Sequence, residues 1–308
     1  DDGKVQVTKD GGATWLDRTA RLAAAGGPAN FWVSRVLPSP HAAGTAFVTK
    51  TGWRLDDYRV SIHKTTDYGE TWTSIAGDLP DGKPVNVVVQ DAKNPALLFV
   101  GTEWGVYVTL DGGQGWLPFR AGMPSVKVTD MVIHPRENDL VVATYGRGAY
   151  VVDISPLQGL TAVALGEDVH LCDIEPRTQR VTGGIGNYRL LGDSHLMTRN
   201  EPNAVVINYY LKAKAEGEVK VTVADPYGTV LAELAGKGEA GLNTVSWGMR
   251  AQRPGARPTG GQRFAGGALV EPGEYVVTLE AAGKKIVKKA VIRYRQGWTV
   301  GPTPVIIH

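Results

Sequence analysis

The stretch Thr65-Thr66-Asp67-Tyr68-Gly69-Glu70-Thr71-Trp72 decides the fold of this chain, because its pattern of threonine, aspartate, glycine and tryptophan occurs three times. Thr8-Lys9-Asp10-Gly11-Gly12-Ala13-Thr14-Trp15 precedes it, and Thr109-Leu110-Asp111-Gly112-Gly113-Gln114-Gly115-Trp116 follows it. The three aspartates stand 57 and then 44 residues apart. Such intervals are typical of a small all-β unit that is repeated in series.

Each octapeptide has the chemistry of a hairpin corner. The residues before the central copy alternate in polarity, as in a half-buried strand. The aspartate can accept hydrogen bonds from backbone N–H groups of the turn, and the glycine takes a backbone angle that other residues resist. We expect the tryptophan to begin the next strand and to lay its ring under the turn.

The pattern resembles the Asp-box of the bacterial neuraminidase repeat, which is found in sialidases, two-domain xyloglucanases and sortilin-type propellers. In those families the Asp-box is a fold element remote from the site. The resemblance therefore implies structural roles here, with catalysis or calcium binding by the aspartates as the alternative. The residues concerned are Asp10, Trp15, Asp67, Trp72, Asp111 and Trp116.

Hydrophobic patterning predicts an all-β chain with two parts. We expect a partial propeller of about three and a half four-stranded blades over 1–156, a connector over 157–199, an immunoglobulin-like β-sandwich over 200–296 and a tail over 297–308. In the second repeat the pattern predicts strands at Phe31–Leu37, Thr45–Lys50, Tyr58–Lys64 and Thr71–Ile75.

The combination resembles secreted bacterial proteins that pair sortilin-like propellers with a carboxy-terminal immunoglobulin-like domain and are often labelled glycosyl hydrolases. Its most specific stretches are Leu98–Trp116, Ile133–Leu140, Thr144–Gly148 and Asp153–Leu157. The likeness implies export to the periplasm, the cell surface or the medium.

The chain opens on Asp1-Asp2-Gly3-Lys4, a turn composition with no strand ahead of it. Propellers close with about four to eight blades, and an open array exposes unpaired strand edges. We therefore expect amino-terminal blades, on the same or a nicked chain, to complete the ring and to carry the signal peptide.

Composition narrows the chemistry. The 308 residues carry 33 basic and 31 acidic side chains, so the bulk charge gives no case for nucleic acid. No apolar run is long enough to span a bilayer. The six histidines lack zinc spacing, and neither a phosphate loop nor a dinucleotide fingerprint occurs. We therefore expect neither a metal nor a cofactor.

Successive loops of a propeller blade lie on alternate faces of the propeller, and this loop parity predicts where a site would lie. In a four-stranded up-and-down blade, the turns between strands two and three face away from the octapeptide corners. On that face the sequence places candidate carboxylates for glycoside hydrolysis at Glu103, Asp56 and Asp57. Candidate ligand-binding residues there are Trp53, Arg54, Arg59, Trp104, Tyr145 and Arg147. The alternative is a solvated polar rim with ion pairs between blades.

The preferred interpretation is an exported binding or scaffolding protein that recognises a polypeptide or a glycan on this face. One alternative is a glycoside hydrolase, sialidase-like or xyloglucanase-like, that acts in the completed propeller. A further alternative is a structural subunit of an envelope assembly.

Overall fold

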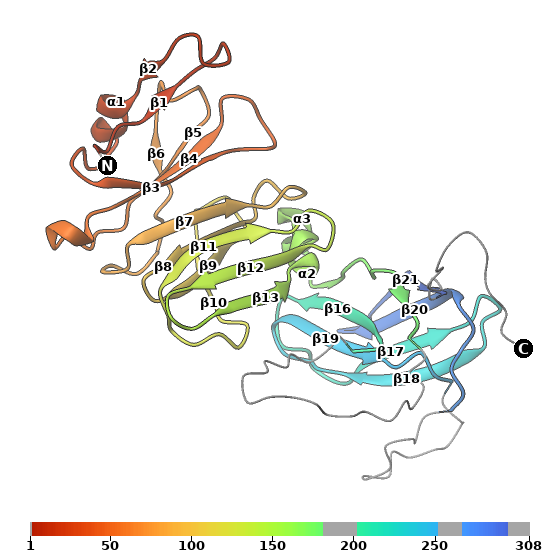
Figure 1. The fold of residues 1–308 in the computed structure, drawn as a ribbon. Helices are drawn as coiled ribbons and strands as arrows, with labels where there is room; N and C mark the ends of the chain where they lie inside the picture. The colour runs from red at the N-terminus through yellow and green to blue at the C-terminus, as the bar shows by residue number, and fades with distance from the viewer. Residues whose placement is uncertain (1, 181–201, 252–266, 295–308) are drawn as a thin grey trace, which may run out of the picture. The chain divides into compact units, whose positions relative to one another are not determined.

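The computed structural model of the chain describes residues 2–180, 202–251 and 267–294, and within them the protein is nearly all β (Figure 1). It has two compact units, Asp1–Ala164 and Leu165–His308. Residues 181–199 of the predicted connector and the predicted tail lie outside the described residues. The helical segments are α1 (Thr19–Ala24), the 3₁₀ turn η1 (Trp53–Leu55), α2 (Ser155–Gln158) and α3 (Ala162–Gly166).

Antiparallel sheets whose strands follow chain order make up the first unit. The first pairs β1 (Gln6–Val7) with β2 (Leu16–Asp17). The next contains β3 (Trp32–Pro38), β4 (Ala46–Thr51), β5 (Ile62–Thr65) and β6 (Thr73–Ser74). Then come β7 (Val85–Gln90), β8 (Leu98–Thr102), β9 (Gly105–Thr109) and β10 (Leu117–Phe119). The last described sheet holds β11 (Val128–Ile133), β12 (Asp139–Thr144) and β13 (Ala149–Asp153).

The octapeptide aspartates close the turns from their side chains. Asp67 Oδ1 accepts hydrogen bonds from Thr71 N (2.9 Å) and Thr65 Oγ1 (2.8 Å), and Asp67 Oδ2 accepts one from Thr71 Oγ1 (2.6 Å). Asp10 makes the same contacts with its own two threonines. These hydrogen bonds, led by that from Thr71, lower the pKa of Asp67 to about 2. The carboxylate therefore remains charged in its turn at neutral pH.

The three octapeptide tryptophans have different surroundings. Trp72 is 8% exposed and donates from Nε1 to Gly69 O (3.1 Å), so its ring lies under its own turn. Trp116 is 4% exposed but donates to Ile75 O (2.9 Å) of the preceding repeat. Trp15 is 58% exposed. The rings of Trp15 and Trp72 therefore both lie against the equivalent glycine of their own turn, Gly12 and Gly69, as expected, whereas Trp116 is hydrogen-bonded to the preceding repeat.

A repeated β-bulge ties neighbouring sheets of the first unit together. The pairing register shifts at the same place in β3, β7 and β11. Ser34, in the β3 bulge, donates from Oγ to Val85 O of β7 (3.0 Å). Asn86, in the β7 bulge, donates from Nδ2 to Val128 O of β11 (3.1 Å). The bulges in β3 and β7 thus each send a polar side chain to the first strand of the next sheet, whereas Thr129 in the β11 bulge donates to Ala143 O of its own sheet (3.1 Å).

Two predicted strands of the second repeat are shorter in the structure, since Thr71–Ile75 is reduced to β6 (Thr73–Ser74) and the strand before it begins late. The sequence pattern predicts a strand from Tyr58, whereas β5 begins at Ile62. The Asp57 carboxylate accepts hydrogen bonds from the backbone N–H (3.1 Å) and the side chain of Arg59. This local turn competes with strand pairing, because aspartate can bond the backbone two residues ahead.

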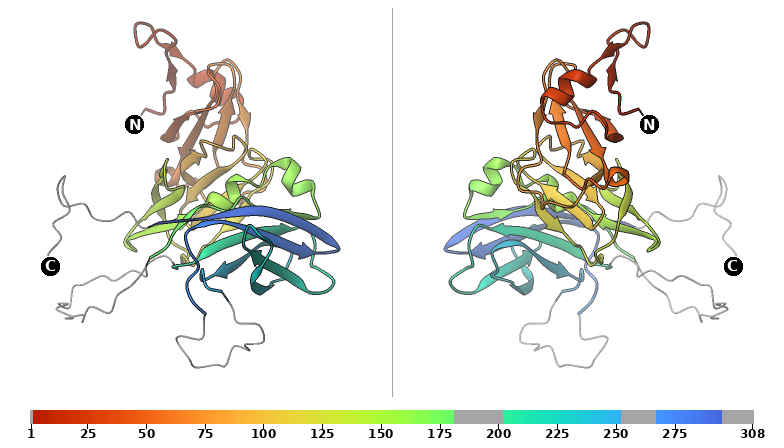
Figure 2. Two further views of the ribbon diagram at one scale, coloured as in Figure 1. Left: turned by 90° about the vertical axis from the view of Figure 1, so that its right-hand side faces the viewer. Right: turned by 90° about the vertical axis from the view of Figure 1, so that its left-hand side faces the viewer.

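Two sheets enclose one shared core in the second unit (Figure 2). One holds β14 (Val169–Leu171), β16 (Val205–Leu211) and β19 (Gly241–Trp247). The other holds β15 (Arg177–Thr178), β17 (Val219–Ala224), β18 (Val230–Gly236), β20 (Gly273–Ala281) and β21 (Lys284–Arg293). Part of the predicted connector is therefore structural, since β14 and β15 belong to these sheets.

Strands β4 and β5 each carry a buried side chain that can be charged. Lys50 is fully buried and donates from Nζ to Pro28 O (2.6 Å). His63 is 3% exposed, and its Nε2 lies 3.1 Å from Ala25 O. Burial lowers the pKa of both groups because it disfavours their charged forms.

Replacing Trp72 by alanine should destabilise the protein strongly, because the buried ring packs with Val5, Leu22 and Val48. We expect a loss of about 3–5 kcal/mol in the free energy of unfolding of the first unit, measured by urea denaturation. The matched control is Trp15→Ala, expected to cost about 0.5 kcal/mol or less. Equal losses in the two variants would contradict the packing described.

Acidification should destabilise the fold through His63. Its folded pKa is lowered, so the unfolded chain binds the proton more readily below its own pKa of about 6.5. Stability is therefore fully present above about pH 6.5 and is lost as the pH falls toward the folded pKa. The urea concentration at the unfolding midpoint should decrease as the pH is lowered from about 7.5 to about 5.5. The decrease should be smaller in His63→Gln. An identical fall in the variant would rule this group out.

Candidate functional site

Loops of the first unit gather at two ends of its sheets. At one end, the octapeptide turns lie beside the loops between first and second strands, because Tyr68 N donates to Gly44 O (2.9 Å) and Gly112 N to Ala96 O (2.9 Å). At the other end, the β12–β13 turn meets the segment that leads into β11, where Tyr145 N donates to Lys127 O (2.9 Å). The candidate residues belong to this second group of turns.

Glu103 lies in the β8–β9 turn and is held by two partners. Its Oε1 accepts a hydrogen bond from Asn86 Nδ2 (3.1 Å) and lies 2.9 Å from Lys127 Nζ. Lys127 Nζ also lies 5.3 Å from the centre of the Trp53 ring. Glu103, Asn86, Lys127 and Trp53 form what we call the Glu103 cluster. The structure thus brings two predicted site residues, Glu103 and Trp53, to the same lysine.

The two arginines of the enlarged β4–β5 loop have partners close by. The Arg54 guanidinium carbon lies 5.4 Å from the centre of the Trp32 ring and 5.1 Å from that of Trp53. Arg59 pairs with Asp57 (2.6 Å), and this hydrogen bonding lowers the pKa of Asp57. Asp56 ends η1 in the left-handed conformation (φ 56°).

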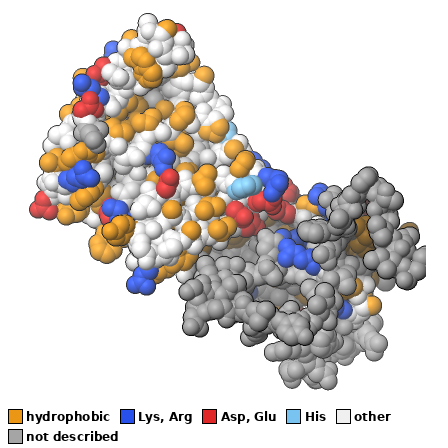
Figure 3. Space-filling view, in the orientation of Figure 1, with side chains coloured by type: hydrophobic (Ala, Val, Ile, Leu, Met, Phe, Trp, Pro, Cys, Tyr) orange, Lys and Arg blue, Asp and Glu red, His pale blue; other side chains and the backbone are white. Residues whose placement is uncertain are grey.

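Tyr145 and Arg147 project from the β12–β13 turn, and Tyr145 is 75% exposed. On the face of the first unit seen in Figure 3, basic and acidic side chains stand among hydrophobic ones. The Glu103 carboxylate contacts Lys127 and Asn86 rather than Asp56 or Asp57.

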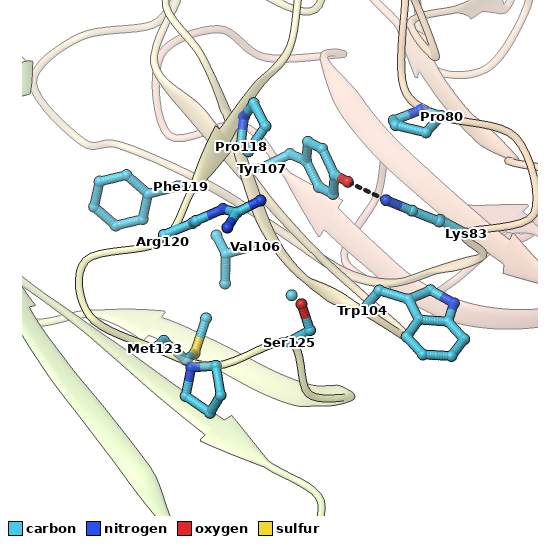
Figure 4. Close-up of a pocket in the computed structure, with 12 residues that line it drawn as sticks. Pro80, Lys83, Trp104, Val106, Tyr107, Pro118, Phe119, Arg120, Met123 and Ser125 are labelled. Atoms are coloured by element: carbon cyan, nitrogen blue, oxygen red, sulfur yellow. Dashed lines mark hydrogen bonds between the residues drawn. The ribbon is translucent and has the colours of Figure 1, made fainter.

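Trp104 lies at the edge of a pocket of about 380 Å³ that Glu103 does not line (Figure 4). The pocket lies between the β8–β9 turn, β9, β10 and the connections at 80–83 and 120–125 (Figure 4). We call it the Trp104 pocket. The side chains that give it its chemistry are Lys83, Trp104, Tyr107, Phe119, Arg120 and Ser125.

The Trp104 pocket combines an exposed ring with two cations. Trp104 is 58% exposed, whereas Tyr107 is 7% exposed and accepts a hydrogen bond from Lys83 Nζ (2.7 Å). Figure 4 shows Lys83 and Arg120 reaching toward Tyr107 from different segments of the chain. No aspartate or glutamate of the described residues lines the pocket. Such a site can stack a flat apolar face and hydrogen-bond polar or anionic groups.

Sequence reasoning missed the lysines and arginine that complete both groups. Lys83, Arg120 and Lys127 lie in the connections between repeats. The loop-parity argument places those connections at the same end as the β4–β5 and β8–β9 turns, so this signal could have found them. It also missed Asn86, because a bulge that turns a side chain toward the next sheet leaves no mark in the hydrophobic pattern.

Other chemistries find little support in the described residues. There, no group of three histidine, cysteine or acidic side chains is arranged to hold a metal ion. Burial raises the pKa of the Cys172 thiol to about 11, so this thiol is not a nucleophile at neutral pH. In the same described ranges, no helix is both long and apolar enough to cross a membrane.

The Glu103 cluster should show a measurable coupling between its charges. In a double-mutant cycle of Glu103→Gln and Lys127→Met, we expect a coupling of about 0.5–1 kcal/mol in the free energy of unfolding. The side chains are 21% and 33% exposed, so salt should weaken the coupling. Urea denaturation at low and high salt measures it. Additive single effects would contradict the pairing.

No protein family model matches the chain, and no curated protein matches it. Solved structures give distant likenesses. An ancestral GH74 enzyme is 14% identical over 84% of this chain and 31% of that chain, with a TM-score of 0.33. The GH74 xyloglucanase from Xanthomonas campestris is 13% identical over 94% of this chain and 42% of that chain, with a TM-score of 0.34.

The extracellular domain of a putative hybrid two-component system from B. thetaiotaomicron is 10% identical over 85% of this chain and 31% of that chain, with a TM-score of 0.30. The chain therefore spans less than half the length of each of these three structures. At identities and scores this low, we draw neither fold nor function from the likenesses.

Proposed function

We propose that the chain is an exported binding protein that takes a glycan at the Trp104 pocket. The observation that carries the proposal is the exposed indole of Trp104 at the edge of a pocket whose walls also supply hydrogen-bonding groups. Sugars bind to proteins through the same combination, because rings stack on their apolar faces while polar groups take their hydroxyls.

The turn that carries Trp104 is fixed before any ligand arrives. Thr102 is fully buried, and its Oγ1 accepts a hydrogen bond from Trp104 N (3.1 Å) and donates one to Gly105 O (2.9 Å). Gly105 has a φ of 129°, which residues with a Cβ rarely adopt. A rigid turn limits the entropy that is lost when a ligand binds, so it favours a binding role for Trp104.

The surroundings of Trp53 favour Trp104 over Trp53 as the stacking platform. Trp53 is 42% exposed, but Lys127 and Arg54 both lie against its ring. A sugar would have to displace these cations, whereas no described cation contacts the Trp104 ring. Trp53 therefore acts in the proposal as a support for the neighbouring turn.

The carboxylates support a hydrolase less well than a binding protein. A glycosidase uses two carboxyl groups about 5 to 9.5 Å apart on either side of the scissile bond. Glu103 is engaged by Lys127 and Asn86, and Asp57 is engaged by Arg59. Since the described pocket lining has no carboxylate, hydrolysis has no acid or nucleophile there.

The finer fold assignments belong to the same proposal. The consecutive strand order and the three octapeptide turns support blades of an Asp-box propeller in the first unit. The two sheets around one core support an immunoglobulin-like sandwich in the second unit, acting as a spacer or docking module.

Replacing Trp104 by alanine should abolish most glycan binding. We expect at least about a tenfold loss of affinity for the oligosaccharides that a glycan array identifies, because stacking on an exposed indole supplies roughly a kcal/mol or more. Isothermal titration calorimetry on the full chain measures the loss.

Trp15→Ala is the matched control, because Trp15 is also 58% exposed but lies in an octapeptide turn. Its affinity should equal that of the parent protein. Unchanged binding in Trp104→Ala, or an equal loss in Trp15→Ala, would contradict the proposed site. Binding of peptides and of no glycan would favour a polypeptide ligand instead.

A further inference from the structure

We infer that the Trp104 pocket selects acidic saccharides, with a uronic acid unit beside Trp104 as the recognised group. This inference rests on the proposed function, because it names the chemical class of the ligand at the same site. It requires that the pocket bind a sugar ring through Trp104 and, in addition, a carboxylate through Lys83 and Arg120.

The charge of the pocket is one-sided although the charge of the chain is balanced. Lys83 and Arg120 line it, and no described acidic side chain does. Glu103, next to Trp104 in the sequence, is directed to Lys127 and Asn86, and the exposed Asp81, two residues before Lys83, is not a lining residue of the pocket. Asp78, in the connection before Lys83, accepts a hydrogen bond from Trp116 N (2.6 Å). The two pocket cations therefore have no carboxylate of the described lining to neutralise them.

The donors of the pocket are arranged to meet an anion. Lys83 Nζ has three N–H groups and uses one on Tyr107 Oη (2.7 Å). Since that oxygen accepts from lysine, the Tyr107 hydroxyl proton is left to donate elsewhere, and Tyr107 is a lining residue of the pocket. Tyr107 itself is 7% exposed, so its position is fixed by packing. Lys83 and Tyr107 together bring N–H and O–H donors to the lining of the pocket.

Arg120 adds a planar donor from another segment of the chain. In Figure 4 its guanidinium reaches toward Tyr107 from the end of β10, while Lys83 comes from the connection before β7. A guanidinium binds a carboxylate through two parallel hydrogen bonds, which suits a planar anion. Ser125, at the edge of the pocket, offers a hydroxyl to a sugar oxygen.

The proposal requires one ligand that stacks on Trp104 and also pairs with Lys83 and Arg120. A free inorganic anion would use the cations and leave Trp104 exposed, whereas a neutral sugar would use Trp104 and leave two cations without a partner. A uronic acid carries both an apolar ring face and a carboxylate within one residue. A pocket of about 380 Å³ has room for such a sugar unit.

The test compares two oligosaccharides with the same sugar backbone, one with charged carboxylates and one with neutral methyl esters. Oligogalacturonate and its fully methyl-esterified form are titrated into the full chain by calorimetry at low salt. We expect the acid to bind about tenfold more tightly than the ester. Added salt should lower the affinity for the acid and leave the affinity for the ester unchanged. In Arg120→Gln and in Lys83→Gln, the affinity for the acid should fall about five- to tenfold while that for the ester stays the same.

Arg136→Gln serves as the control, because Arg136 lies in the β11–β12 loop with its side chain 82% exposed. It should leave both affinities unchanged. Equal binding of acid and ester, both lost in Trp104→Ala, would overturn the inference and leave the proposed function intact. Tighter binding of a sulfated oligosaccharide than of oligogalacturonate would show that the pocket recognises sulfate rather than a carboxylate, and would also overturn the inference. Absence of binding to any saccharide would overturn both proposals.

Discussion

The hydrogen bonds that Thr65 and Thr71 make to the Asp67 carboxylate are the contacts on which the first unit depends. They close the corner between β5 and β6 within the octapeptide, and Tyr68 N and the Glu70 carboxylate then attach this corner to Gly44 and to Arg18 and Arg21. The closed corner places Trp72 under its own turn, where it packs with residues of the preceding repeat. Because structure is fixed at this end of the sheets, the turns at the other end can differ in length and chemistry between repeats.

At that other end, some charged side chains hold turns together and others line the proposed binding pocket. Lys127 lies between Glu103 and Trp53 and joins turns of different repeats. Lys83 contacts the Tyr107 hydroxyl and lines a pocket without described carboxylates. The adjacent residues Glu103 and Trp104 thus belong to different environments: one acidic side chain that holds the turns in place, and one ring that is presented to solvent.

The sequence predicted the framework better than the site. Strand positions such as Thr45–Lys50 follow from the hydrophobic pattern, and the structure has β4 at Ala46–Thr51. Periodicity failed at Tyr58, where an aspartate side chain competes for the backbone. Loop parity identified the turns that carry Glu103 and Trp104 but gave no side-chain directions within them. It therefore grouped Trp104 with Trp53. It omitted Lys83 and Arg120, because their position in the Trp104 pocket depends on how the connections at 80–83 and 120–125 fold. The propeller and immunoglobulin-like assignments stay predictions.

The most direct measurement is the indole N–H spectrum of the ¹⁵N-labelled full chain during titration with a bound oligosaccharide. The account predicts that the Trp104 resonance shifts in proportion to saturation, while the resonances of Trp15 and the buried Trp72 and Trp116 stay in place. Shifts confined to Trp53, or saturation without any change at Trp104, would contradict it.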